Sequence, residues 1–152
     1  MPSDLWDFAQ RLYGRPGVER ACLQLQEAGA DVCLLLCGAW LQRHGVACTP
    51  ARLAHLQAIA QPWQTEVISP LRQLRQNWRT AAQQQTPLAT LRERLKELEL
   101  DAEQQLLLAL QACAHDWARA SESAVPAWLE ALAGTDADPD ALQLLRDEAM
   151  QA

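Results

Sequence analysis

The sequence predicts an all-α fold, a single-domain bundle of about seven or eight helices that spans residues 1–152. Leucine and alanine supply 53 of the 152 residues, whereas the β-branched valine and isoleucine supply seven, and this composition favours helices over strands. The stretch from Asp31 to Leu41, DVCLLLCGAWL, is apolar on every side. A helix of this kind has no solvent-facing side, so we expect 31–44 to be a central helix surrounded by the others.

The first two predicted helices, 4–13 and 16–28, are expected to pack around the central helix. Each has one apolar stripe at the i, i+3, i+4, i+7 spacing of a half-buried helix: Leu5, Phe8, Ala9 and Leu12 in the first, and Val18, Ala21, Cys22 and Leu25 in the second.

Within the central helix, the side chain of Asp31 is predicted to cap the first turn. Leu34, Leu35, Leu36 and Trp40 should be nearly inaccessible to solvent, and Gly38 should mark the place where another helix comes close.

Prolines mark the starts of the later helices, because proline is accepted at the first helical position. Four of them follow a side chain that can cap a helix: Thr49-Pro50, Ser69-Pro70, Thr86-Pro87 and Asp138-Pro139. The predicted helices are 50–60, 62–83 with a break or kink at Pro70, 87–118, 125–133 and 139–150.

Segments 62–83 and 87–118 are expected to form a long antiparallel pair, joined by the polar turn Ala-Ala-Gln-Gln-Gln-Thr. Each has an apolar residue every three or four positions: Trp63, Val67, Leu71, Leu74, Trp78 and Ala82 in the first, and Leu88, Leu91, Leu95, Leu98, Ala102, Leu106, Ala109 or Leu110, Cys113 and Trp117 in the second. The second segment is either one long helix or two helices that break near Asp101.

Charge and cysteine usage indicate an acidic cytoplasmic protein. The net charge is −6, and residues 1–96 contain 11 basic and 7 acidic side chains, whereas residues 97–152 contain 2 and 12. An acidic chain of this kind is a poor nucleic-acid binder. Five cysteines are an odd number, and the first residues do not resemble a signal peptide. Val32–Leu41 is about half as long as a membrane span, so we expect no membrane association.

Two stretches resemble a proteobacterial domain-of-unknown-function family. Residues 5–41 carry the pattern LW-x-FA-x-x-LY, PGV, ACL-x-LQ and G-x-DV-x-LLL, and residues 62–79 carry a Pro-Leu-Arg-x-Leu-Arg core. Together the two stretches cover about a third of the chain. The resemblance implies a small bacterial cytoplasmic protein and gives no mechanism. Cys33 stands where the family usually has Asn, and Gln76 stands where a second Arg is frequent.

No motif points to catalysis or to a cofactor. Cys33, Cys37 and His44 could offer three zinc ligands by spacing, but the leucines between them favour structural packing, so we expect no metal. His55 and His115 stand alone, and the sequence contains no glycine-rich phosphate loop and no Gly-x-Ser-x-Gly motif. The sequence therefore favours a protein that is not an enzyme.

Two groups of residues are candidate binding sites. Trp6, Asp7 and Tyr13 combine aromatic rings with an acid on the first helix, and they either form a partner surface or cover the edge of the core.

Arg72, Arg75 and Arg79 form a stripe at i, i+3 and i+7. This stripe is a solvated or internally paired helix face, a surface for an acidic protein, or a weak nucleic-acid contact.

The leading functional hypothesis is a cytoplasmic adaptor or regulatory protein that binds another protein, with homo-oligomers as a further form of association. The alternative is a binder of a small anionic ligand, or an enzyme, with a pocket between the first helix, the central helix and segment 62–83. Trp6, Tyr13, Trp63 and Arg72 would line that pocket.

Overall fold

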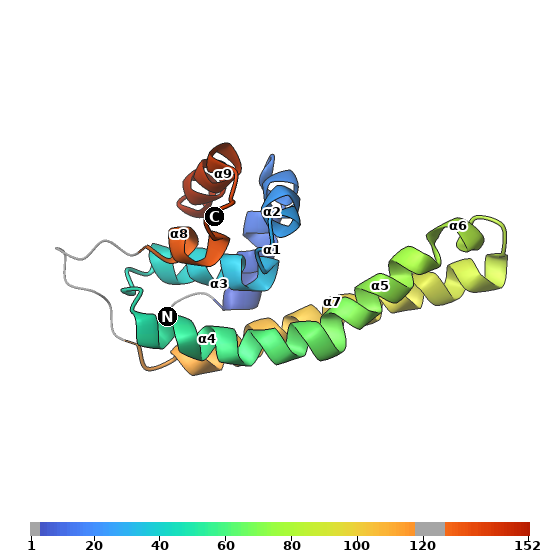
Figure 1. Ribbon diagram of the computed structural model, residues 1–152, viewed down its shortest axis with the longest axis horizontal. Coiled ribbons are helices and arrows are strands. Elements are labelled where there is room, and N and C mark those ends of the chain that lie inside the picture. Colours follow the sequence, from blue (N-terminus) through green and yellow to red (C-terminus); the bar gives the residue numbers. More distant parts are fainter. Residues whose placement is uncertain (1–3, 118–126) are drawn as a thin grey trace.

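The computed structural model describes residues 4–117 and 127–152, and all the regular elements in these residues are helical (Figure 1). The all-α prediction is therefore confirmed. The last residue of the predicted helix 87–118 and the first two of the predicted helix 125–133 lie outside the described residues.

The helices form two parts, which we call the head and the arm (Figure 1). The head contains α1 (Leu5–Tyr13), α2 (Val18–Glu27), α3 (Val32–Arg43), α8 (Trp128–Ala133) and α9 (Pro139–Ala149). In the arm, α4 (Pro50–Trp63), the π-helical segment η1 (Gln64–Ile68), α5 (Ser69–Asn77) and α6 (Arg79–Ala82) run outward, and α7 (Thr86–Ala114) runs back beside them.

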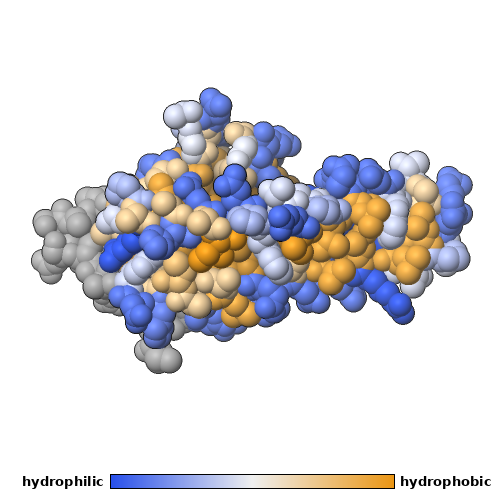
Figure 2. All heavy atoms as spheres, turned by 60° about the horizontal axis from the view of Figure 1, so that its bottom comes forward, coloured by the Kyte–Doolittle hydropathy of each residue, from blue (hydrophilic) through white to orange (hydrophobic). Residues whose placement is uncertain are grey.

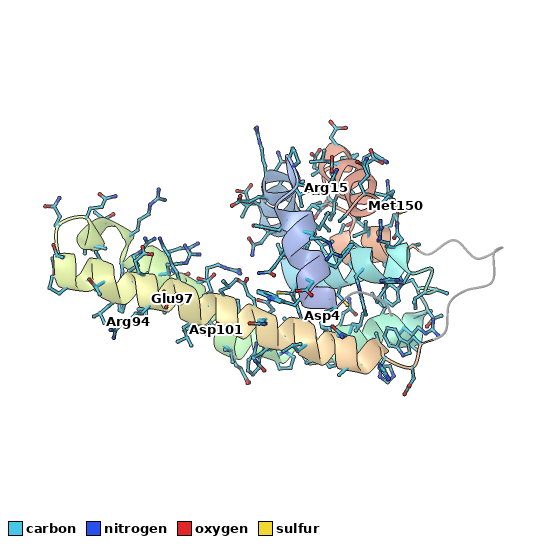
Figure 3. All side chains as sticks on the ribbon, turned by 180° about the vertical axis from the view of Figure 1, so that it is seen from behind. Asp4, Arg15, Arg94, Glu97, Asp101 and Met150 are labelled. Atoms are coloured by element: carbon cyan, nitrogen blue, oxygen red, sulfur yellow. The ribbon has the colours of Figure 1, made fainter. Side chains whose placement is uncertain are left out.

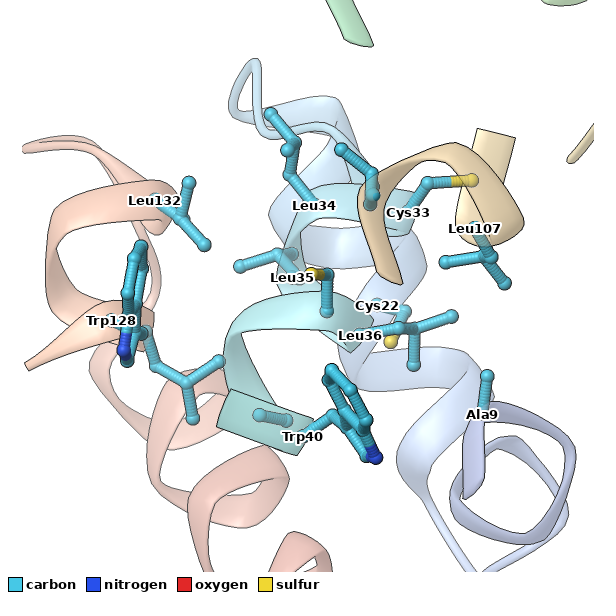
Figure 4. Close-up of a cluster of buried hydrophobic side chains, with 14 of the residues drawn as sticks. Ala9, Cys22, Cys33, Leu34, Leu35, Leu36, Trp40, Leu107, Trp128 and Leu132 are labelled. Carbon is cyan, nitrogen blue, oxygen red and sulfur yellow. The ribbon is translucent and has the colours of Figure 1, made fainter. Parts of the chain in front are cut away.

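The centre of the head is α3, as the apolar run predicts. The Asp31 side chain accepts a hydrogen bond from the Leu34 backbone N–H at 3.3 Å and caps the helix. All residues from Cys33 to Leu41 are buried, Leu35 completely (Figure 4). A Cβ atom on Gly38 would lie 2.6 Å from Leu132 Cδ1 and 3.2 Å from Trp128 Cβ, so α8 can pack here only because residue 38 has no side chain. The predicted close approach of another helix at Gly38 is therefore confirmed.

Two contacts between distant parts of the chain close the head. The fully buried Trp128 on α8 donates from Nε1 to the carbonyl oxygen of Val46 at 2.7 Å. The α9 helix packs against α2, with Leu145 buried and with an ion pair between Arg15 and Glu148 at the edge. The C-terminal helices thereby cover the side of α3 that faces away from the arm (Figure 1).

The run from α4 through η1 to α5, which we call the outward helix, continues through Pro62 and Pro70, so the predicted boundary between 50–60 and 62–83 is wrong. Pro62 lies inside α4, and the wider π-helical turn of η1 leads directly into Pro70 of α5. Proline has no N–H to donate to the preceding turn, and a π-helical turn re-routes the local hydrogen bonds without ending the helix.

Two of the four predicted proline-linked caps are confirmed. Thr49 and Asp138 accept from the backbone N–H groups of Arg52 and Ala141. Ser69 and Thr86 make no side-chain cap, because Ser69 continues the helix from η1 and Thr86 is already the first residue of α7. The α7 helix is continuous past Asp101, which settles the choice between one helix and two.

The predicted inward stripe of α7 is partly wrong, because Leu91 and Leu98 are 50% and 53% exposed. The buried face consists of Leu95, Glu99, Ala102, Leu106, Leu107, Leu110 and Ala114. In a part of the molecule that is only two helices thick, each helix can bury one face, and apolar residues outside it stay in solvent.

Candidate functional site

A cleft of about 900 Å³ lies where the head meets the base of the arm. The head supplies Trp6 and Tyr13 from α1 and Asp31 from the start of α3, and the arm supplies Arg72 from α5 and Glu103 from α7. Six glutamines of α1, α2 and the outward helix line it as well: Gln10, Gln26, Gln57, Gln61, Gln64 and Gln76. Its place corresponds to the pocket considered from the sequence.

An ion-pair network forms one wall of the cleft. Arg75 Nε lies 2.6 Å from Glu99 Oε1, and Arg72 Nε lies 3.3 Å from Glu99 Oε2. Arg72 also approaches Glu103, with 3.6 Å between Nη2 and Oε1. Glu99 is only 7% exposed, so both arginines are held toward α7 by a buried carboxylate. This network joins α5 to α7 and pairs two of the three arginines of the predicted stripe with acids.

Two further carboxyl groups of the cleft, those of Asp31 and Glu103, are partly shielded from water by burial. Burial raises the pKa of Glu103 above its ordinary value, and the neighbouring charge of Glu99 adds to that effect, although Arg72 and Arg75 oppose it. Burial also raises the pKa of Asp31, which accepts a hydrogen bond from Gln64 Nε2 at 2.9 Å. The pKa of Tyr13 is raised to about 12, mainly by burial, so its hydroxyl is neutral at physiological pH.

The structure separates the predicted site residues into three groups. Trp6, Tyr13, Arg72 and Arg75 line the cleft, whereas Asp7, which is exposed on α1, does not. Arg79 is exposed on α6, farther out along the arm. Trp63 does not line the cleft, and its Nε1 donates to the carbonyl oxygen of Ala102 at 2.8 Å, which ties α4 to α7.

Trp63 instead borders a second hollow, which we call the arm groove. This groove has a volume of about 500 Å³ and runs between the outward helix and α7. Its lining is mostly apolar: Trp63, Val67, Pro70, Leu71, Leu74, Leu98 and Ala102, with Glu66, Asp101 and Gln105. Figure 2 shows apolar side chains gathered along the arm, so this surface is apolar and open.

Three of the five cysteines are packed in the core as apolar side chains. Cys22, Cys33 and Cys37 are buried, and burial raises the pKa of each thiol, most strongly for Cys33 and Cys37, so the thiolate is disfavoured. His44 packs edge-on against Trp40. Across residues 4–117 and 127–152, no three His, Cys, Asp or Glu side chains lie together as a metal site would need.

Sequence reasoning missed Glu99 and Glu103. One signal was present: Glu99 falls four residues after Leu95 and three before Ala102, so an acid sits within the buried stripe of α7. A charge at such a position requires a partner of opposite sign, and Arg72 and Arg75 are available on the facing helix. Glu103 follows one turn later on the same side.

Comparison with known proteins gives a family and no function. A family model described as a protein of unknown function, DUF2390, matches residues 4–123. No curated protein and no solved structure matches the chain. In the described part of the chain, no helix combines the length and the apolar character needed to cross a membrane.

Proposed function

Because the chain belongs to the DUF2390 family of proteins of unknown function, we propose a function from its own surfaces: it is a cytoplasmic interaction protein whose arm binds an amphipathic helix of another protein. The observation that carries this proposal is the open apolar arm groove between the outward helix and α7. Binding of an amphipathic helix in a groove between two helices is a recurrent mode of recognition.

Exposed side chains of the arm provide the apolar contact. Trp63, Leu74 and Leu98, which line the groove, are 36%, 38% and 53% exposed, and Leu91 farther out on α7 is 50% exposed. Leu91 and Leu98 are seven residues apart, so they lie on one side of α7. Large apolar side chains gathered on one surface indicate an interaction site, whereas singly scattered ones need no explanation.

The shape of the arm favours a third helix as the occupant. Two antiparallel helices bury only the faces that they turn toward each other, and a third helix laid along their shared groove converts the pair into a three-helix layer. A helix of about 20 residues is roughly 30 Å long and could follow the groove past Leu98 toward Leu91.

The charges beside the groove favour a basic partner helix. Glu66 and Asp101 line the groove, and neither forms an ion pair with another described residue. Figure 3 shows Arg94, Glu97 and Asp101 following one another along α7. A partner helix with lysine or arginine beside its apolar stripe would therefore bind faster and more tightly than one with acids.

The cytoplasmic setting is part of the proposal. All five cysteines are free, as expected of a protein kept in a reducing compartment. The nucleic-acid alternative has less support, because Arg72 and Arg75 are engaged by Glu99 and only Arg79 of the predicted stripe is exposed.

Two synthetic peptides test the proposal. They share one leucine stripe on a helix of about 20 residues, and they differ in having lysine or glutamate beside that stripe. We expect the lysine peptide to bind the full chain in a fluorescence anisotropy titration, and Leu98→Asp to weaken that binding by about tenfold or more. Met150→Asp is the matched control, because Met150 is 61% exposed in the head (Figure 3) and should not affect binding.

Three results would contradict the proposed occupant. Equal binding of both peptides would contradict the preference for a basic partner. Unchanged binding by Leu98→Asp would show that the peptide does not bind in the arm groove. Self-association of the chain, measured by sedimentation and abolished by Leu98→Asp, would replace the partner helix with the arm of a second copy.

A further inference from the structure

The cleft at the base of the arm carries a net negative charge, although two arginines line it. Four carboxyl groups line it, those of Glu19, Asp31, Glu99 and Glu103, against the two guanidinium groups of Arg72 and Arg75. The excess is two negative charges. In a concave site, such an excess concentrates cations and repels anions.

The two arginines are not free to bind an anion. Arg75 meets Glu99 at 2.6 Å and again, through Nη2, at 3.4 Å, and Arg92 Nε donates to the Arg75 carbonyl oxygen at 2.9 Å, which holds the same turn of α5 against α7. An anionic ligand would have to displace the buried carboxylate of Glu99, which would then lie unpaired beside α5. The anionic ligand considered from the sequence is therefore disfavoured by this geometry.

The aromatic side chains of the cleft favour a cation. Trp6 and Tyr13 are both partly buried, pack on the core of the head and line the cleft. The face of an aromatic ring attracts an ammonium or guanidinium group, and this attraction adds to that of a nearby carboxylate. A cleft of about 900 Å³ has room for a ligand of ordinary metabolite size, or for a basic side chain of a partner.

We propose that this cleft binds an organic cation, through an amine or guanidinium group that contacts the carboxylates of Asp31 and Glu103 and the aromatic rings of Trp6 and Tyr13. A metal ion is disfavoured as the cation, since the described residues bring no three potential metal ligands together. Gln10, Gln61 and Gln64 supply neutral donors and acceptors that would fix the rest of the ligand. The proposal is independent of the arm groove, which lies elsewhere on the arm and has a different lining.

The test compares 1,4-diaminobutane with 1,4-butanediol, which has the same carbon chain and no charge. We expect isothermal titration calorimetry of the full chain to show binding of the diamine and none of the diol. Glu103→Gln and Asp31→Asn should each weaken diamine binding by about tenfold, because each removes one charge and preserves the shape of the side chain. Asn also caps helices well, so Asp31→Asn keeps the start of α3.

Asp7→Asn is the matched control. Asp7 lies on the same helix as Trp6 and Tyr13 but outside the cleft, so this variant should bind the diamine as the unchanged protein does. Absence of diamine binding, equal binding of the diol, or equal weakening by Asp7→Asn would overturn the proposal. Far-UV circular dichroism of each variant confirms that the helices are retained, so that a loss of binding reports on the cleft.

Discussion

Gly38 is the residue at which the C-terminal helices meet the centre of the head, and its lack of a side chain is a packing requirement. It lies inside α3, where glycine costs about 1 kcal/mol relative to alanine, so its presence needs a compensating reason. That reason is the approach of Leu132 and Trp128, which a Cβ atom would meet at 2.6 Å and 3.2 Å.

We expect Gly38→Leu to lower the free energy of unfolding by about 3 kcal/mol, since an overpacked core must shift α8. Urea unfolding followed by circular dichroism measures the change. Gly14→Leu is the control, because Gly14 is exposed, has a φ of −80° and leaves 3.4 Å to the nearest atom, so the cost should stay below about 1 kcal/mol. Equal losses at the two positions would show that α8 does not depend on Gly38.

Glu103 provides a test of stability against pH. Its pKa in the folded protein is raised above the ordinary 4.5, so the folded state holds the proton more tightly than the unfolded state does. The stability gained on protonation is fully present below pH 4.5 and is lost as the pH rises through the raised pKa.

We therefore expect Glu103→Gln to unfold at a higher temperature than the unchanged protein at pH 7, and this advantage should disappear as the pH approaches 4.5. Thermal melts at both pH values measure it, with Glu97→Gln as the control on the exposed side of α7 (Figure 3). A lower melting temperature for Glu103→Gln at pH 7 would mean that the pair with Arg72 outweighs the burial of the charge.

At the scale of the helix pair, Glu99 holds α5 against α7, because it forms ion pairs with both Arg72 and Arg75. Its removal leaves two partly buried guanidinium groups without their main acceptor. We expect Glu99→Gln to cost about 1–3 kcal/mol in the free energy of unfolding.

Glu93→Gln, which breaks only the exposed pair with Lys96, should cost less than about 0.5 kcal/mol in the same urea titration. Similar costs for the two substitutions would show that the arm does not rely on the buried pair.

The helices differ in how far their residues could be predicted from the sequence. In α3 the burial of its side chains follows from the local sequence, because a helix that is apolar on every side must be surrounded by other helices. The buried residues predicted in this way are Leu34, Leu35, Leu36 and Trp40. In α7 the pattern is ambiguous, since leucines occur on more than half of its circumference. Only the position of the facing helix decides that Leu95 is buried and Leu98 is exposed.

The path of the outward helix is a second limit on local prediction. Pro62 and Pro70 each indicate a helix start when read alone, and Ser69 strengthens that reading. Instead, α4, η1 and α5 all pack against α7, and this packing keeps them in one line. The π-helical turn changes the local hydrogen-bond pattern where proline has no N–H to donate. Tertiary contacts therefore override a local signal for a helix boundary.

At the scale of the whole molecule, the cleft could be predicted only in outline. Its walls come from α1, α2 and α3 of the head and from α4, α5 and α7 of the arm. The meeting of these helices depends on the angle at which the arm leaves the head (Figure 1). The sequence places Trp6, Tyr13 and Arg72 on suitable faces, but it cannot show that Glu99 and Glu103 neutralise the arginines. The sign of charge in the cleft is thus a property of the assembled fold.

The family match ends at residue 123, yet the helices beyond it complete the head. Trp128 and Leu129 on α8 and Leu145 on α9 are fully buried, and each contributes about 1.5–3 kcal/mol by burial alone. Without them, the apolar surface of α3 beside Gly38 would face solvent.

We therefore expect a chain ended after residue 123 to lose its cooperative unfolding transition and to bind a hydrophobic dye, although the arm, α4 to α7, keeps its own contacts. Differential scanning calorimetry and dye fluorescence measure the two effects. A peptide of residues 127–152 added in trans should restore the transition, because α8 and α9 contact α3 and α2 without needing a covalent link. A truncated chain that unfolds cooperatively at the original temperature would show that α1, α2 and the arm suffice to bury α3.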